Sequence, residues 1–118
     1  MCIRDRVRND PQFGHTLTLA SGGILAELVS DSATLLLPAR REEVAEALHS
    51  LRIAALIGGY RKRQAADPER VLDTLCAVIS FTAGLGAQLD ELEINPLMIT
   101  SSGCIAADVL LRVDQNTL

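Results

Sequence analysis

Glu-Leu-Glu-Ile-Asn-Pro-Leu, residues 91–97, is the most informative segment of this 118-residue chain for its fold. Successive side chains of an extended strand point to opposite faces. The side chains of Leu92 and Ile94 therefore point to one face, and those of Glu91, Glu93 and Asn95 point to the other. Pro96 has no N–H to give to a sheet, so strand pairing must break or lie at an edge beside Asn95. The break predicts a place that a ligand can reach.

A second apolar segment, residues 104–113, comes after the turn-forming residues 101–103 and is interrupted by Asp108. A four-residue loop would place Asn95 directly opposite Asp108, and a two-residue loop would place them diagonally on one face. A three-residue loop would put them on opposite faces, because a slip of one residue reverses every side chain. The first two loops gather Glu93, Asn95 and Asp108 into a cluster of oxygen donors of the kind that suits Mg²⁺. An ordinary hairpin with a solvated acidic face is the alternative.

The same residues carry a family resemblance. Glu-x-Asn-Pro-Leu, a turn and then Ala-x-Asp resemble the end of the ATP-grasp domain in the NDP-forming acyl-CoA synthetases, which include the ADP-forming acetate–CoA ligases. The resemblance implies that Asn95 and Asp108 hold the magnesium that bridges the nucleotide phosphates, with Glu93 flanking it in the same metal site. ATP and Mg²⁺ are the expected cofactors, and no catalytic residue is assigned within the chain.

A second specific motif and weaker glycine and arginine matches extend the resemblance over about residues 7–113. Asp-Pro-Gln-Phe-Gly at residues 10–14 corresponds to a wall of the nucleotide site in the family. A Gly-Gly step places Glu27 near the phosphates, and the basic segment 57–63 contains Arg61, implied to contact phosphate or CoA. A solvated basic loop is the alternative for Arg61, because Lys62 adds bulk where the family has a glycine.

The hydrophobic pattern predicts an α+β fold, with a mostly antiparallel sheet and two helices packed on it. The helices are expected at about 42–52 and 68–83, and Leu89–Ile99 is expected to pair with Ile105–Val113. In the terms of the resemblance this is the C-terminal subdomain of an ATP-grasp domain, at 7–113. Residues 1–6 show no strand pattern that continues into residues 7–14 and are interpreted as an unrelated or artefactual leader, and 114–118 as a polar tail.

Composition excludes several classes of protein. The formal net charge of −4 argues against a nucleic-acid-binding surface. No apolar run approaching the roughly 20 residues of a membrane span is recognised, so no membrane partner is expected. The three cysteines have no CxxC spacing and are interpreted as reduced thiols of a cytoplasmic protein.

The resemblance implies a fragment of an acyl-CoA synthetase that contributes the Mg-ATP side of the nucleotide site. The whole enzyme would convert an acid, CoA and ATP into acyl-CoA, ADP and phosphate. The CoA and the carboxylic acid would bind to other parts of an oligomeric or multidomain parent, so the fragment alone is predicted to be inactive. The alternatives are the synthetase-like regulatory region of a bacterial protein lysine acetyltransferase and a non-catalytic interaction domain.

Overall fold

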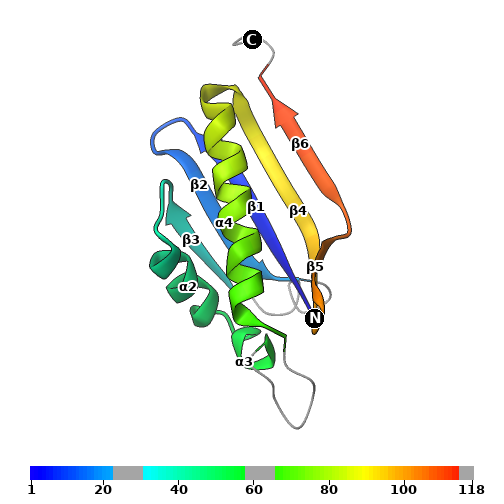
Figure 1. Ribbon diagram of the computed structural model, residues 1–118. Coiled ribbons are helices and arrows are strands. Elements are labelled where there is room, and N and C mark those ends of the chain that lie inside the picture. Colours follow the sequence, from blue (N-terminus) through cyan, green and yellow to red (C-terminus); the bar gives the residue numbers. More distant parts are fainter. Residues whose placement is uncertain (23–30, 58–65, 115–118) are drawn as a thin grey trace.

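A computed structural model describes residues 1–22, 31–57 and 66–114 (Figure 1). Its strands form one antiparallel sheet with the order β3-β2-β1-β4-β5, in which β6 also pairs with β4. The strands are β1 (Cys2–Asp10), β2 (Gly14–Ser21), β3 (Ser32–Leu36), β4 (Leu89–Thr100), β5 (Gly103–Ala106) and β6 (Val109–Val113). The predicted α+β class with an antiparallel sheet is confirmed.

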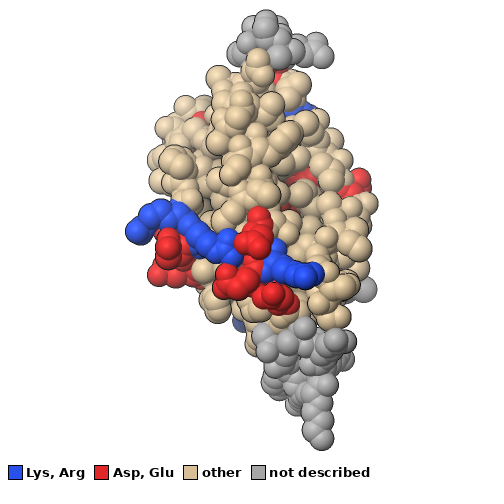
Figure 2. All heavy atoms as spheres, in the orientation of Figure 1, with Lys and Arg blue, Asp and Glu red and all other residues tan. Residues whose placement is uncertain are grey.

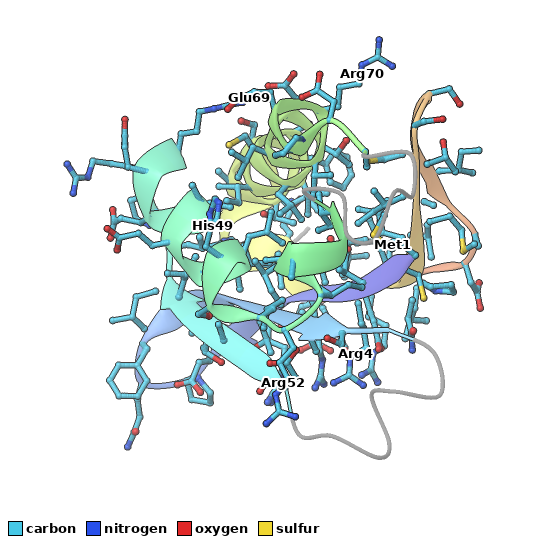
Figure 3. All side chains as sticks on the ribbon, turned by 90° about the horizontal axis from the view of Figure 1, so that it is seen from below. Met1, Arg4, His49, Arg52, Glu69 and Arg70 are labelled. Atoms are coloured by element: carbon cyan, nitrogen blue, oxygen red, sulfur yellow. The ribbon has the colours of Figure 1, made fainter. Side chains whose placement is uncertain are left out.

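The helices gather on one face of the sheet (Figures 1 and 3). They are α2 (Arg41–Ser50), the short α3 (Ala54–Ile57), α4 (Pro68–Leu85) and the 3₁₀ turn η1 (Gly86–Gln88). The two predicted helices correspond to α2 and α4, with ends shifted by one or two residues. The buried apolar side chains of the sheet and of these helices form one core.

The start of α4 is explained by its local sequence. The Asp67 carboxylate accepts a hydrogen bond from the Glu69 N–H at 3.0 Å, and Pro68 occupies the first helical position, where no N–H is needed. The helix buries Val71 and Leu75 among other side chains against the sheet. By length and composition alone, the segment Pro68–Gln88 is apolar enough to cross a membrane, so the expectation that no such run exists is wrong. The same test is passed by core helices of soluble proteins.

Ion pairs join α2 to α4 on the outer surface. Arg41 donates from one guanidinium nitrogen to Glu69 at 2.7 Å and from the other to Asp73 at 2.8 Å. Figure 2 shows a band of blue and red atoms, from Lys or Arg and Asp or Glu side chains, across the lower part of this face. Exposed pairs of this kind contribute little each, so the apolar core beneath them carries most of the stability.

The expectation that residues 1–6 show no strand pattern is wrong. They form most of β1, which lies between β2 and β4, and the side chains of Ile3 and Val7 are fully buried. Arg4 and Arg6 alternate with them and face away from the helices. The strand was not predicted because arginines occupy every second position. Such a pattern is also typical of a solvated tail, and only the assembled sheet shows that these arginines lie on its outer face.

Asp5 lies on the helical side of β1, between Ile3 and Val7, and is only 1% exposed. Neither of its carboxyl oxygens has a hydrogen-bond partner among the described residues. Burial raises the pKa of Asp5 to about 7, against an ordinary value of 3.8. The folded chain therefore holds a proton on Asp5 at pH values where the unfolded chain has released it.

This pKa predicts a loss of stability as pH rises. The free energy of unfolding falls between about pH 4 and 7 as the folded carboxyl resists ionisation, and it is flat above pH 7 as far as Asp5 is concerned. Each pKa unit corresponds to 1.36 kcal/mol, so the full effect is roughly 4 kcal/mol. Denaturant unfolding of wild type and Asp5→Val at several pH values measures it: the advantage of the variant should grow from pH 4 to 7. A difference that is constant with pH would contradict the placement of Asp5.

The edge strand β6 is exposed on both faces. Its apolar side chains Val109, Leu110, Leu111 and Val113 are between 39% and 52% exposed, and no described helix covers them (Figure 1). A contiguous apolar edge is a template for association between chains.

We therefore expect the isolated chain to self-associate through this edge. Leu111→Lys should shift sedimentation velocity profiles toward the monomer, because a lysine on an edge strand opposes pairing with a second chain. Ser80→Lys adds the same charge on the exposed side of α4 and serves as the matched control. Equal association of both variants and wild type would show that β6 is not the surface involved.

Candidate metal site

The hairpin that contains the candidate residues has a two-residue turn, Ser101-Ser102, with Thr100 paired to Gly103. This register sets Asn95 directly opposite Asp108, and the Asn95 N–H donates to the Asp108 carbonyl oxygen at 3.1 Å. A two-residue loop was expected to give a diagonal arrangement. That expectation is wrong. The turn Ser101-Ser102 pairs Thr100 with Gly103, and a four-residue loop over residues 100–103 would give the same register.

The predicted pairing of Leu89–Ile99 with Ile105–Val113 is present but divided. Ala107 and Asp108 separate β5 from β6, and β4 pairs with both. Pro96 lies opposite this interruption, and its carbonyl oxygen accepts a bond from the Ala107 N–H at 3.0 Å. The strand pairing is therefore interrupted beside Pro96, as predicted from the N–H that proline lacks.

Glu93, Asn95 and Asp108 converge on one hollow. It has a volume of about 330 Å³ and is also lined by Val109 and Leu110. The Glu93 side chain is 23% exposed, and Asn95 and Asp108 are exposed, so all three can meet solvent or a ligand. The three predicted metal ligands therefore share one face and one cavity.

The donor set fits a magnesium ion that keeps part of its water shell. It offers two carboxylates and one carboxamide, and Mg²⁺ prefers oxygen ligands while releasing water reluctantly. Among the described residues no three His, Cys, Asp or Glu side chains lie close enough to form a metal site by themselves. The site is therefore open and needs further oxygens from water or from a phosphate.

A cation of the protein already lies beside this hollow. The Arg4 Nε is 4.0 Å from the Glu93 Oε1, and Figure 3 shows Arg4 pointing from the sheet away from the helices. Arg4 is 41% exposed, so the contact is weak and solvent-screened.

Glu91 does not behave as its alternating position suggests. The alternation places it on the outer face of the sheet with Glu93 and Asn95, yet it is only 4% exposed. Its carboxylate accepts hydrogen bonds from the Arg112 Nη2 and, at 2.5 Å, from the Arg6 Nε. The Arg112 guanidinium foremost, and then that of Arg6, hold the pKa of Glu91 below its usual range. The two arginines come from different strands, so only the sheet topology reveals the cluster.

The other two site predictions, Glu27 and Arg61, lie outside the described residues. A second hollow of about 330 Å³ lies near the turn between β1 and β2 and is lined by Phe13, Pro38 and Ile79 among others. On its rim the His15 Nε2–H donates to the Gly86 carbonyl oxygen at 2.8 Å. Its lining is mostly apolar and brings no carboxylates together, so it does not compete as a metal site.

Known proteins identify the family of this chain. The model of the ATP-grasp domain family matches residues 3–113. The chain is 27% identical over 107 residues to the beta subunit of acetate–CoA ligase (ADP-forming) II of Pyrococcus furiosus, covering 91% of this chain and 45% of the subunit. It is 26% identical over 102 residues to acetate–CoA ligase (ADP-forming) I of Archaeoglobus fulgidus, covering 86% of this chain and 15% of that ligase.

Solved structures share the fold. A dinucleotide-forming acetyl-coenzyme A synthetase of Candidatus Korarchaeum cryptofilum, in complex with coenzyme A and Mg-AMPPCP, superposes with a TM-score of 0.86 at 21% identity, covering 96% of this chain and 53% of that one. A protein of Pyrococcus horikoshii gives a TM-score of 0.86 at 23% identity, covering 96% and 48%. The chain thus spans about half the length of these chains and of the Pyrococcus furiosus subunit.

Proposed function

Because this chain belongs to the ATP-grasp domain family, we propose that it is the part of an ADP-forming acyl-CoA synthetase that binds the magnesium and phosphates of the nucleotide. The whole enzyme would form acyl-CoA, ADP and phosphate from an acid, CoA and ATP. The relatives in Pyrococcus furiosus and Archaeoglobus fulgidus are acetate–CoA ligases, which favours this assignment over the acetyltransferase region and the interaction domain.

One observation carries the proposal: three oxygen-bearing side chains from two paired strands meet at one hollow. Asn95 lies directly opposite Asp108, and Glu93 is two residues along the same strand on the same face. The carbonyl oxygen of Asp108 is occupied by the Asn95 N–H, so the side chain is the group it offers to a ligand.

The three side chains would contribute differently to metal binding, because two are charged and one is neutral. Glu93 and Asp108 would supply negative charge, and Asn95 would supply a neutral carboxamide oxygen that fixes position. A bound magnesium ion would neutralise charge that develops across the β and γ phosphates during phosphoryl transfer. The protein's own contribution is to orient these donors, and no side chain of the described part is required as a nucleophile.

The other substrates would bind elsewhere. The chain covers 45% of the Pyrococcus furiosus subunit and 15% of the Archaeoglobus fulgidus ligase, so CoA and the carboxylic acid would meet other domains or subunits. We expect the 118-residue chain alone to form no acyl-CoA, and a cytoplasmic parent without nucleic-acid partners.

Replacement of Asp108 tests the metal site. Asp108→Asn keeps the shape of the side chain and removes its charge, so the affinity of the chain for Mn²⁺, a spectroscopic substitute for Mg²⁺ that also accepts oxygen ligands, should fall at least tenfold. A tenfold loss corresponds to about 1.4 kcal/mol. Water-proton relaxation during a Mn²⁺ titration measures it.

Asp90→Asn is the matched control, because Asp90 is an exposed carboxylate of β4 that does not line the hollow. Its affinity for Mn²⁺ should equal that of wild type. The fold should be unchanged in both variants, since the backbone bond between Asn95 and Asp108 is kept. Equal affinities for Asp108→Asn and wild type would remove Asp108 from the site.

A further inference from the structure

β6, the strand next to Asp108, has little packing to hold it in the register that the two-residue turn and β5 set. Register is strongly specified where one face of a strand is buried, because a slip then exposes the apolar side chains. All five residues of β6 are exposed, and its residues on both faces are largely apolar. Packing of β6 therefore adds little to the register that the turn and β5 set at Asp108.

A displacement of one residue would destroy the site. It would move Asp108 to the other face of the sheet, away from Glu93 and Asn95. The pairing of β4 with β6 already contains one irregularity, between Leu89 and Glu91. Beyond it the strands run in one register from the pair of Glu91 with Arg112 to the bond between Asn95 and Asp108.

Next to the irregularity, Glu91 of β4 and Arg112 of β6 form a hydrogen-bonded ion pair between these two strands. Glu91 is 4% exposed, and its carboxylate accepts from Arg112 of β6 on one side and from Arg6 of β1 on the other. A buried carboxylate that loses a guanidinium partner is strongly destabilised, so a slipped register that separates Glu91 from Arg112 is disfavoured. Arg112 also lies 3.9 Å from Asp90, but both side chains are more than half exposed there.

We infer that Glu91 and Arg112 are positioning residues for the candidate metal site: their pair holds β6 in the register that places Asp108 opposite Asn95. The inference rests on the proposed function. Neither residue lines the hollow, so both act through the strand pairing.

The test uses the 118-residue chain with two readouts. The first is hydrogen exchange of the Asn95 N–H, which donates to the Asp108 carbonyl oxygen just before β6 and reports the register locally. The second is the affinity for Mn²⁺. In Arg112→Gln and in Glu91→Gln, exchange of this N–H should quicken at least tenfold and Mn²⁺ should bind at least tenfold more weakly. Exchange of the Val7 N–H, in the central strand β1, should stay the same in Arg112→Gln, because Arg112 is at the edge of the sheet.

Two further variants separate positioning from general damage. Arg112→Lys keeps the positive charge and should restore part of both losses. Asp90→Asn removes the exposed neighbour of Arg112 and should leave both readouts within twofold of wild type. If Glu91→Gln fails to fold, Arg112→Gln decides the question, because Arg112 is more than half exposed and its replacement spares the core.

The outcomes are distinct. Folded Arg112→Gln with wild-type exchange of the Asn95 N–H and wild-type Mn²⁺ affinity overturns the inference and leaves the proposed function standing. A wild-type chain that binds Mn²⁺ neither alone nor in the presence of ATP overturns the proposed function, and with it the role of the pair at a metal site.

Discussion

β4 pairs with β1 along one edge and with β5 and β6 along the other, and this double pairing positions both the core and the candidate site. Its apolar side chains Leu92 and Ile94 are buried in the core beneath the helices. Because the side chains of a strand alternate, the burial of this face fixes Glu93 and Asn95 on the opposite face. The core and the candidate site are thus two consequences of one strand register.

Two buried carboxylates on neighbouring strands show how the two faces differ. Asp5 points toward the helices and has no partner among the described residues, so desolvation dominates and raises its pKa. Glu91 points to the other face, where the hydrogen bonds from Arg112 and Arg6 outweigh desolvation and lower its pKa. Glu91 therefore loses its stabilising effect as pH falls through its lowered pKa, whereas Asp5 destabilises the fold as pH rises toward 7. These two groups limit stability from opposite sides of the pH range.

The sequence predicts the parts of the fold that depend on short-range pattern. The alternation around Ile94, the turn at Ser101-Ser102 and the cap at Asp67 each lie within a few residues, and the strands and helix that they predict are present. The placement of Asn95 and Asp108 on one face was predicted as one of several possible loop geometries. This placement depends only on the register of a hairpin, and the few possible registers can be enumerated from the sequence.

What the sequence does not predict depends on contacts between distant segments. The burial of Glu91 requires an arginine from β1, 85 residues away in sequence, and another from β6. The long side chains of arginine cover the carboxylate while their own ends stay partly in solvent, so neither composition nor periodicity signals the cluster. The strand character of β1 was missed for the same reason, since its outer arginines are matched by carboxylates of β4 only when the sheet is assembled.

The charge distribution on this face favours a cation that arrives together with phosphate. Glu91 is neutralised by its two arginines, which leaves Glu93 and Asp108 as the carboxylates that line the hollow. Arg4, 4.0 Å from Glu93, opposes a free divalent ion, because like charges repel even through solvent. The same guanidinium attracts the negative phosphates that accompany a magnesium–nucleotide complex. An open set of three oxygens beside an arginine is therefore better matched to magnesium with phosphate than to the ion alone, and this is how proteins commonly bind Mg²⁺.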